Sequence, residues 1–263
     1  MTPSTLAHEE WGSGEPVVLL HGFPFHRGQW RALGSELGRH VRVIAPDLRG
    51  FGGSAFTDMV AGRAWTMEQH ADDVAALLDA LAIRGPVTLF GFSMGGYVAL
   101  AFLRRHGARV GALGLINTRA IADSQEAAAG RAALAAKALA EGPGPVIEAM
   151  LPRLLAPQTL AKRPEVAAAV RALMEVAPRE GIAASLRGMA LRADSNELLP
   201  RVGVPTLVVV GEHDAISSPT EMAGIAQAIP GARFTQLPAA GHMTTHEAPA
   251  ELARASLDFL RSL

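Results

Sequence analysis

Residues 87–96 read VTLFGFSMGG, a strand pattern followed directly by a helix pattern. Its first four residues have the β-forming, mostly apolar character of a buried strand, and residues 94–105 have the apolar period of a helix. Between them Gly91, Ser93 and Gly95 match G-x-S-x-G. This pattern serves a sharp strand-to-helix turn, where larger side chains two residues from the serine would collide. We therefore predict that Ser93 is held in a strained turn as a nucleophile.

Apolar runs on either side of this turn predict the rest of a sheet. They occur at residues 16–20, 41–45, 112–116, 205–211 and 232–237. Helical patterns alternate with these runs. One helix opens at Thr66, whose spacing to Gln69 is that of a capping box, and another closes the sequence near residues 248–263. The alternation predicts an α/β fold with a mostly parallel sheet and helices on both faces.

No convincing strand pattern occurs between about residue 120 and residue 196. This segment is rich in Ala, Leu and Arg and is interrupted at residues 142–145, Pro157, Pro164 and Pro178, which predicts about four helices. The sheet pattern resumes after it. We therefore predict an α/β core domain formed by residues 1–119 and 197–263, with residues 120–196 inserted as an all-helical segment.

The composition excludes several classes of function. The 263 residues carry 24 Lys and Arg against 25 Asp and Glu, so we expect no basic surface for nucleic acid. The absence of cysteine excludes disulfides, cysteine-ligated zinc, iron–sulfur clusters and a thiol nucleophile. The first residues lack the apolar core of a secretory signal, and no apolar run approaches the ~20 residues of a membrane span. We expect a cytoplasmic protein.

A serine nucleophile needs a base and an acid that orients the base. Asp214 comes just after the apolar run 207–210, and His242 lies in a glycine-bearing loop after the next strand. The chain order Ser93, Asp214, His242 is the one that this type of turn uses. Asp47 is the rival acid, but it precedes Ser93. The histidines that suit the role less well by position are His8, His21, His26, His40, His70, His106, His213 and His246.

The tetrahedral intermediate of acyl transfer needs two backbone N–H donors for its oxyanion. The N–H of Met94 is one candidate, because the first N–H groups of a helix are unpaired. The second donor is expected in the loop that holds Phe23, since the following Pro24 has no N–H.

Two other polar features of the first half are expected to be structural. His21 is expected to hydrogen-bond its own loop rather than to take part in catalysis. The glycine-rich residues 47–54 lack the Gly-Lys-Ser/Thr of a phosphate loop. We expect these residues to form a turn that is stabilised by a charge network between Asp47 and Arg49.

Five motifs, taken in order, resemble those of the α/β-hydrolase superfamily. They are HGFP at 21–24, DLRGFGGS at 47–54, GFSMG at 91–95, GEHD at 211–214 and GH at 241–242. The resemblance implies an eight-stranded, mostly parallel sheet with residues 120–196 as a helical cap over the active site. It also implies that the N–H groups of Phe23 and Met94 are the oxyanion donors.

Within that superfamily the chain is most similar to small bacterial esterases, enol-lactonases and cofactor-free haloperoxidases. Residues 117–123 together with Arg131 are similar to a segment common in that group. Haloalkane dehalogenases and epoxide hydrolases carry Asp at the nucleophile position, so Ser93 counts against both activities. Asn117 lies where some relatives place the acid, but an amide cannot carry that charge, which leaves Asp214.

The side chains expected to line a substrate pocket are Phe92, Arg119, Ile121, Met150, Leu154, Met189 and Met243. An apolar, methionine-bearing pocket suits short or medium acyl esters. Arg119 has two interpretations. It binds a substrate carboxylate, or it forms an ion pair with Asp123 four residues further on.

The sequence thus predicts a carboxylesterase-like serine hydrolase that cleaves a small-molecule ester through an acyl-enzyme, with no metal or cofactor. One alternative is a lactonase, similar to enol-lactonases, that acts on an acidic metabolite. A third interpretation is a ligand receptor that has the hydrolase fold but no turnover. The expected partners are small-molecule esters or lactones, without nucleic acid and without a membrane span.

Overall fold

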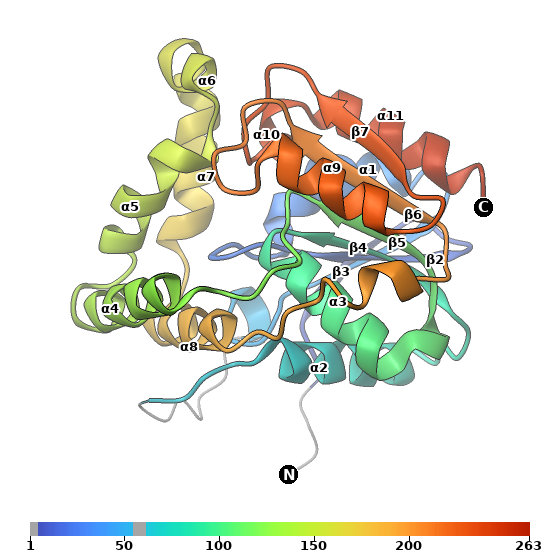
Figure 1. The fold of residues 1–263 in the computed structure, drawn as a ribbon, viewed down its shortest axis with the longest axis horizontal. Coiled ribbons are helices and arrows are strands. Elements are labelled where there is room, and N and C mark those ends of the chain that lie inside the picture. Colours follow the sequence, from blue (N-terminus) through green and yellow to red (C-terminus); the bar gives the residue numbers. More distant parts are fainter. Residues whose placement is uncertain (1–4, 55–61) are drawn as a thin grey trace.

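A computed structural model of the protein describes residues 5–54 and 62–263. Its centre is one sheet with the strand order β1-β3-β2-β4-β5-β6-β7, in which β1 is antiparallel to β3 and every other pairing is parallel (Figure 1). The strands are β1 (His8–Trp11), β2 (Pro16–Leu20), β3 (Arg42–Pro46), β4 (Val87–Phe92), β5 (Val110–Ile116), β6 (Thr206–Gly211) and β7 (Arg233–Leu237).

The expectation of eight strands is wrong for the described residues, which form seven. That number was implied by the family resemblance and not by apolar runs in this chain. The runs located six strands to within about two residues, and the seventh is β1. Its sequence HEEW is polar because the strand lies at an edge of the sheet and none of its residues is fully buried.

Helices cover both faces of the sheet, as the alternating pattern predicts. α1 (Arg31–Leu37) packs against α11 (Pro249–Leu260), while α2 (Met67–Ala80) packs against α3 (Met94–His106) (Figure 1). α9 (Pro219–Ala228) packs on β6 and β7. The shorter helices of the core are α10 (Thr244–Glu247) and the 3-10 turns Arg27–Trp30, Gly52–Ser54, Gly107–Arg109 and Leu199–Arg201.

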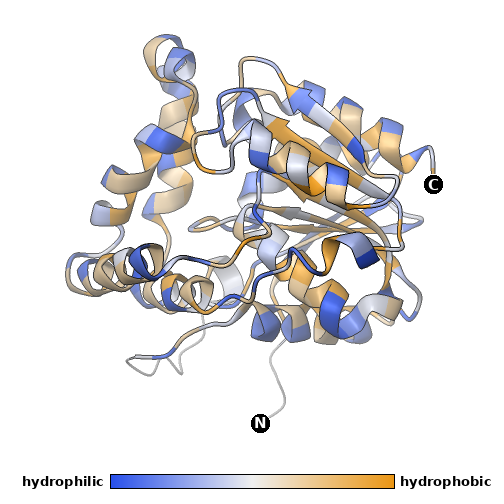
Figure 2. Cartoon of the chain, in the orientation of Figure 1, coloured by the Kyte–Doolittle hydropathy of each residue, from blue (hydrophilic) through white to orange (hydrophobic). Residues whose placement is uncertain are grey.

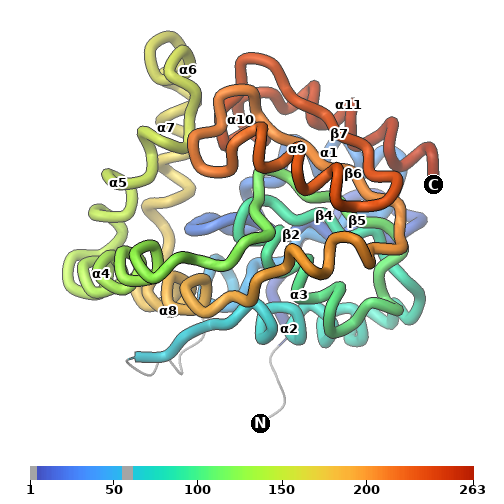
Figure 3. Tube along the Cα trace, viewed as in Figure 1, coloured from blue at the N-terminus to red at the C-terminus, as the bar shows by residue number. Residues whose placement is uncertain are grey.

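The segment between β5 and β6 consists of helices and loops. No strand occurs in residues 117–205, all of which the structure describes. Five helices form there instead of about four: α4 (Gln125–Glu141), α5 (Gly144–Leu154), α6 (Pro157–Lys162), α7 (Pro164–Glu175) and α8 (Arg179–Ala190). α4 packs against α8 and α5 against α7. Figures 1 and 3 show this group standing beside one end of the sheet.

Local sequence signals set several helix starts. Thr66 caps α2: its Oγ1 accepts a hydrogen bond from the Gln69 N–H at 3.2 Å, and the Gln69 Oε1 accepts one from the Thr66 N–H at 3.0 Å. This confirms the predicted capping box. Proline occupies the first positions of α5, α6 and α7, where its missing N–H costs no hydrogen bond. The prolines that break the pattern in the sequence therefore start new helices.

The apolar residues concentrate in the sheet. Residues 17–20, 43–45 and 207–210 are all buried, and Figure 2 shows apolar strands at the centre of the molecule and helices with one polar and one apolar side. Such two-sided burial is typical of a parallel sheet between helix layers. Among the described residues, no helix combines the length and the hydropathy that crossing a membrane requires.

Candidate active site

Ser93 lies in the turn between β4 and α3 with a φ of 52° and a ψ of −114°. A positive φ is rare for a residue with a side chain. The neighbouring glycines are sterically required. A Cβ on Gly91 would lie 2.3 Å from the carbonyl oxygen of Gly95, and a Cβ on Gly95 would lie 2.1 Å from that of Leu20. The sharp turn predicted from G-x-S-x-G is therefore present, with the serine at its apex.

Two hydrogen bonds hold this turn to the next strand. The Ser93 N–H donates to the Ile116 carbonyl at 2.9 Å, and the Thr118 hydroxyl donates to the Ser93 carbonyl at 2.7 Å. Ser93 itself is partly exposed. The backbone of the residue is thus fixed while its side chain retains access to a ligand.

Asp214 and His242 form a buried pair. Asp214 comes three residues after β6 and His242 five residues after β7, and His242 Nδ1 lies 2.9 Å from Asp214 Oδ2. The two residues are 5% and 2% exposed. A carboxylate in this position selects the imidazole tautomer with its proton on Nδ1, which leaves Nε2 as the basic nitrogen.

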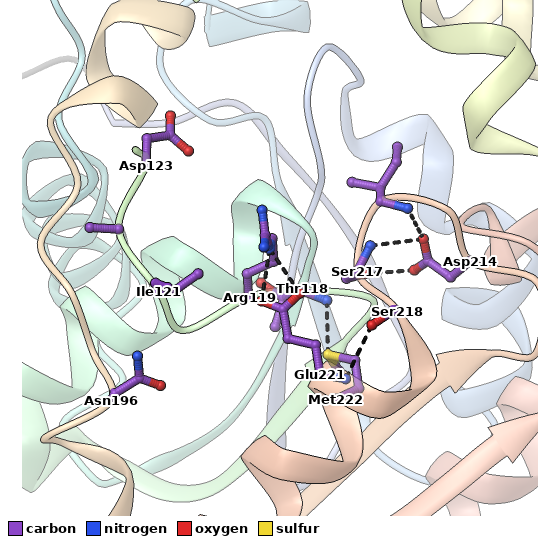
Figure 4. A network of polar contacts seen from close by, with 12 residues as sticks. Thr118, Arg119, Ile121, Asp123, Asn196, Asp214, Ser217, Ser218, Glu221 and Met222 are labelled. Atoms are coloured by element: carbon purple, nitrogen blue, oxygen red, sulfur yellow. Dashed lines mark hydrogen bonds and ion pairs between the residues drawn. The ribbon is translucent and has the colours of Figure 1, made fainter. Parts of the chain in front are cut away.

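Asp214 accepts hydrogen bonds on both oxygens. Oδ1 accepts from the N–H groups of Ile216 at 2.8 Å and Ser217 at 3.0 Å. Oδ2 accepts from the Ser217 hydroxyl at 2.6 Å and from Asn117 Nδ2 at 2.8 Å (Figure 4 draws the bonds between Ser217 and Asp214). Burial acts to raise the pKa of Asp214, but the charge of His242 and the hydrogen bonds from His242, Asn117 and Ser217 lower it below its ordinary value. The acid is therefore ionised at neutral pH.

Asn117 is a site residue whose role the sequence did not reveal. Its φ is 47°, and its carboxamide donates to Asp214 while its Oδ1 accepts from the Thr244 hydroxyl at 2.7 Å. The Thr244 N–H in turn donates to the His242 carbonyl at 2.9 Å. Asn117 thus connects the acid to the chain segment of the histidine. The signals in the sequence are an amide directly after a strand and the position of Asn117 where some members of the similar family carry the acid.

The Ser93 turn, the Asp214–His242 pair and the loop after β2 all lie next to Phe92. The Phe92 and His242 rings are 5.0 Å apart between centroids. A Cβ on Gly22 would lie 2.7 Å from the Phe92 ring and 3.3 Å from the Ser93 Cβ. Residues after β2, β4, β6 and β7 therefore meet at the carboxyl end of the sheet, where open α/β sheets place their ligand sites.

Among residues 5–54 and 62–263, neither the N–H of Phe23 nor that of Met94, the first residue of α3, has a hydrogen-bond acceptor. The loop of Phe23 is fixed by two bonds, from the Gly22 N–H to Gln29 Oε1 at 3.1 Å and from the Phe25 N–H to the Gly22 carbonyl at 3.0 Å. These are the donors that the family resemblance implies for an oxyanion.

His21 holds this first loop together. Its Nε2 accepts from the Leu48 N–H at 2.8 Å, and its Nδ1 lies 2.8 Å from the Gly22 carbonyl oxygen. Burial lowers the pKa of His21 to about 4, so the ring is neutral at pH 7. The hydrogen bond to its own loop that was expected for His21 is confirmed.

The charges of the glycine-rich loop pair differently from the expectation. Asp47 accepts from the backbone N–H groups of Arg27 and Gly53, both at 2.7 Å, and forms an ion pair with the Arg27 guanidinium. Arg49 pairs with Asp73 of α2. The predicted Asp47–Arg49 network is therefore wrong, because the turn directs the two side chains to different neighbours.

A profile of the family described as "alpha/beta hydrolase fold" matches residues 15–249. The chain belongs to the alpha/beta hydrolase family. Among solved structures, a thermophilic esterase from Thermogutta terrifontis with malate bound is similar at 46% identity and a TM-score of 0.94, over 98% of this chain and 93% of that one. The enol-lactonase from Burkholderia xenovorans LB400 is similar at 31% identity and a TM-score of 0.87, over 97% and 96%.

Curated sequences extend the comparison. The pimeloyl-[acyl-carrier protein] methyl ester esterase of Chromobacterium violaceum is 29% identical over 97% of this chain and 95% of that protein. Two further curated relatives align only locally, over 36% and 42% of their own length. Esterase and enol-lactonase neighbours on a shared fold support a hydrolase.

In this hydrolase, some of the residues expected to line the pocket gather at His242. The Phe92 ring lies against it, and the Met243 N–H donates to the Leu154 carbonyl at 2.9 Å. Leu154 and Met243 are buried, and Met150 is half-buried. Met189 is also buried, and its sulfur lies 3.6 Å from Arg131 Nη1.

Arg119 and Ile121 lie elsewhere, beside α9. Arg119 Nε lies 2.7 and 3.0 Å from the two carboxylate oxygens of Glu221, and Figure 4 shows it directed there and not at Asp123. The predicted Arg119–Asp123 pair is wrong because residues 117–123 are not helical, so spacing of four does not bring them together. Asp123 pairs with Arg131 and Arg192. Ile121 is 44% exposed and lines a separate surface pocket with Arg119 and Glu221.

Among the residues that the structure describes, no group of three or more His, Cys, Asp or Glu side chains is placed to hold a metal ion.

Proposed function

We propose that the protein is a serine hydrolase that cleaves carboxylic esters of small to medium size through an acyl-enzyme. The observation that carries the proposal is Ser93 at the apex of a strained turn, at the same end of the sheet as a hydrogen-bonded Asp214–His242 pair. Nucleophile, base and orienting acid in this arrangement are the requirements of acyl transfer.

In the first half-reaction, Ser93 Oγ bonds to the ester carbonyl carbon while its proton passes to His242 Nε2. Asp214 stabilises the imidazolium that forms. The tetrahedral intermediate then collapses, the bond to the leaving alkoxide breaks, and His242 returns the proton to that oxygen. The alcohol departs and leaves Ser93 acylated.

In the second half-reaction, His242 takes a proton from water as the water oxygen bonds to the acyl carbon. The Ser93 ester bond breaks, Ser93 Oγ regains its proton, and the carboxylic acid leaves. The N–H groups of Phe23 and Met94 are the proposed donors to the oxyanion in both halves. One such donor typically lowers the barrier by about 3 kcal/mol.

Residues 120–196, which contain α4 to α8, are proposed as a cap on a core of residues 1–119 and 197–263. Contact between Leu154 of α5 and Met243 beside His242 supports this arrangement. Phe92, Leu154 and Met243 supply apolar surface for an acyl chain, as Met150 and Met189 would further along the cap. An apolar wall with few polar groups suits an uncharged acyl group.

A second candidate activity, hydrolysis of an enol-lactone, is favoured by the similarity to the Burkholderia xenovorans enzyme. An acidic lactone would need a cation, and Arg119 was the residue expected to supply it. Because the carboxylate of Glu221 already occupies Arg119, we favour the uncharged ester. Arg119→Ala should change kcat/KM for charged and uncharged substrates alike by less than about threefold. Selective loss on an anionic lactone would instead favour the lactonase.

The proposed function is tested by turnover of p-nitrophenyl acetate, butyrate and octanoate beside simple and enol lactones. Ser93→Ala should abolish hydrolysis without unfolding the protein. Ser13→Ala, which replaces an exposed serine in the turn before β2, is the matched control and should keep full activity. Activity that survives Ser93→Ala would refute the mechanism. Tight ligand binding without any turnover would favour a receptor.

A further inference from the structure

The chain around His242 is joined to the helical segment by one buried carboxylate. Glu247 closes α10, five residues after His242, and is 7% exposed. Its Oε2 accepts from the N–H of Gly241, directly before the histidine, at 2.8 Å. Its Oε1 accepts from the N–H of Ala156, between α5 and α6, at 2.8 Å. A single side chain therefore bonds to backbone on both sides of the junction.

Further hydrogen bonds hold the chain around His242 and the helical segment in one relative position. The Met243 N–H donates to the Leu154 carbonyl at 2.9 Å, and Gln158 Nε2 donates to the Ala239 carbonyl at 2.9 Å. Arg163 Nη1 donates to the backbone carbonyl of Glu247 at 2.8 Å. A Cβ on Gly241 would lie 2.5 Å from the Ala156 nitrogen, so the two backbones are in direct contact.

The chemistry of the junction requires a carboxylate. Two N–H donors converge on Glu247, and no cationic side chain forms an ion pair with its carboxylate within residues 5–54 and 62–263. A glutamine has one acceptor oxygen, and its NH₂ group would face the second N–H, leaving two buried donors opposed. Buried donors without acceptors are costly, so the backbone would separate at one side.

We propose that Glu247 is a positioning residue that fixes the backbone of Gly241 and His242 against Leu155 and Ala156. This inference rests on the proposed function, in which His242 is the base. It assigns to Glu247 the task of keeping the imidazole in register with Ser93 while the helical segment forms the neighbouring wall. Displacement of a catalytic group by ~1 Å can cost about 10²-fold in rate.

The test compares Glu247→Gln and Glu247→Asp with Glu212→Gln. Glu212 is the matched control because its exposed carboxylate accepts from the Ala239 N–H in the same loop, at 2.8 Å, but does not bond to the helical segment. The rate of p-nitrophenyl butyrate hydrolysis is divided by the concentration of active sites. That concentration is determined by titration with an organophosphonate that reacts with a nucleophilic serine. Each variant is assayed well below its own Tm.

Glu247→Gln should lower kcat by about 10- to 100-fold with a smaller change in KM. Glu247→Asp, which keeps the charge but reaches less far, should recover part of that loss and serves alone if the glutamine variant does not fold. Glu212→Gln should stay within about twofold of the parent protein. A lowered Tm with unchanged kcat in the Glu247 variants would overturn the proposal, because Glu247 would then be structural only.

Amide hydrogen exchange provides a readout that needs no turnover. In Glu247→Gln, the peptides that contain Gly241 and Ala156 should lose protection together, whereas in Glu212→Gln the loss should be confined to the loop of Ala239 and the peptide of Ala156 should stay protected. Loss of protection at only one of these two segments would contradict a Glu247 side chain that connects them. Failure of the proposed function is recognised separately, because it would show as turnover that persists in Ser93→Ala.

Discussion

His242 Nδ1 lies 2.9 Å from Oδ2 of Asp214, and both side chains are shielded from solvent. This hydrogen bond joins the loops that follow two neighbouring strands, β6 and β7. The His242 ring is therefore oriented from the side of the sheet, while the backbone of Gly241 and Met243 contacts the helical segment.

Asp214→Asn should lower kcat by about 10⁴-fold while the protein remains folded, because the amide no longer stabilises the imidazolium or selects the correct tautomer. The measurement is kcat for a p-nitrophenyl ester, with near-UV circular dichroism as a check on folding. Asp258→Asn is the control, since Asp258 is an exposed carboxylate on α11. A variant Asp214→Asn with more than a tenth of the parent rate would exclude Asp214 as the acid.

Ser217→Ala and Asn117→Gly should each lower kcat by roughly 10-fold, because each removes one hydrogen bond to the charged Asp214. Glycine is chosen at position 117 because the native φ is positive. Ser218→Ala is the matched control: Ser218 caps α9 through the Glu221 N–H at 3.2 Å and does not bond to Asp214. The control should lose about 1 kcal/mol of stability and keep its kcat. Equal rates in all three variants would contradict this role.

Gly95→Ala should lower the free energy of unfolding by more than about 2 kcal/mol and abolish activity. The added Cβ would lie 2.1 Å from the Leu20 carbonyl, and backbone must move to admit it. Gly107→Ala, at the other end of α3, has helical dihedral angles and open space around its Cα, so its stability should be unchanged or slightly higher. Urea unfolding of both variants gives the comparison. Similar stabilities of Gly95→Ala and Gly107→Ala would mean that the turn around Ser93 can accommodate a methyl group at position 95.

The buried His70 should account for part of the decrease in the free energy of unfolding at acid pH. Burial lowers the pKa of His70 to about 3, and two further effects act in the same direction: the charge that His21 carries once it is protonated, and the charge of Arg49. Below pH ~6.5 the unfolded chain binds a proton at this position while the folded protein does not until about pH 3. Stability is therefore full above pH ~6.5 and falls with pH across that window, by about 1.4 kcal/mol per pH unit.

His70→Leu should flatten the fall in unfolding free energy between pH 6.5 and pH 5 by about that amount per unit. Part of the slope should remain, because burial also lowers the pKa values of His21 and His246, each to about 4. His40→Leu, at an exposed position, is the control and should retain the slope of the parent protein. An unchanged slope in His70→Leu would mean that His70 takes up its proton in the folded state.

Much of the fold follows from short-range patterns in the sequence. Buried strands such as Pro16–Leu20 consist of apolar residues that occur together only where both sheet faces are covered. The strained turn at Ser93 follows from glycine spacing, which is a local steric requirement. β1 escaped detection because an edge strand satisfies its backbone with one neighbour and leaves its side chains polar.

The site was only partly predictable, for a physical reason. Ser93, Asp214 and His242 each follow a strand, so position along the chain marks them as candidates. Asn117, Ser217 and Glu247 act through hydrogen bonds to groups far away in the sequence or in a turn whose shape the sequence leaves open. The partner of Arg119 was misassigned for the same reason, since a loop and not a helix follows β5.

The most direct measurement of the central claim is the site of acylation. The protein is mixed with p-nitrophenyl acetate, quenched in acid during the first turnovers and analysed by peptide mass spectrometry. We expect an acetyl group on the peptide that contains Ser93, at up to one per molecule, and none on that peptide in Ser93→Ala. Turnover with no covalent intermediate, or with the acetyl group on another side chain, would contradict it.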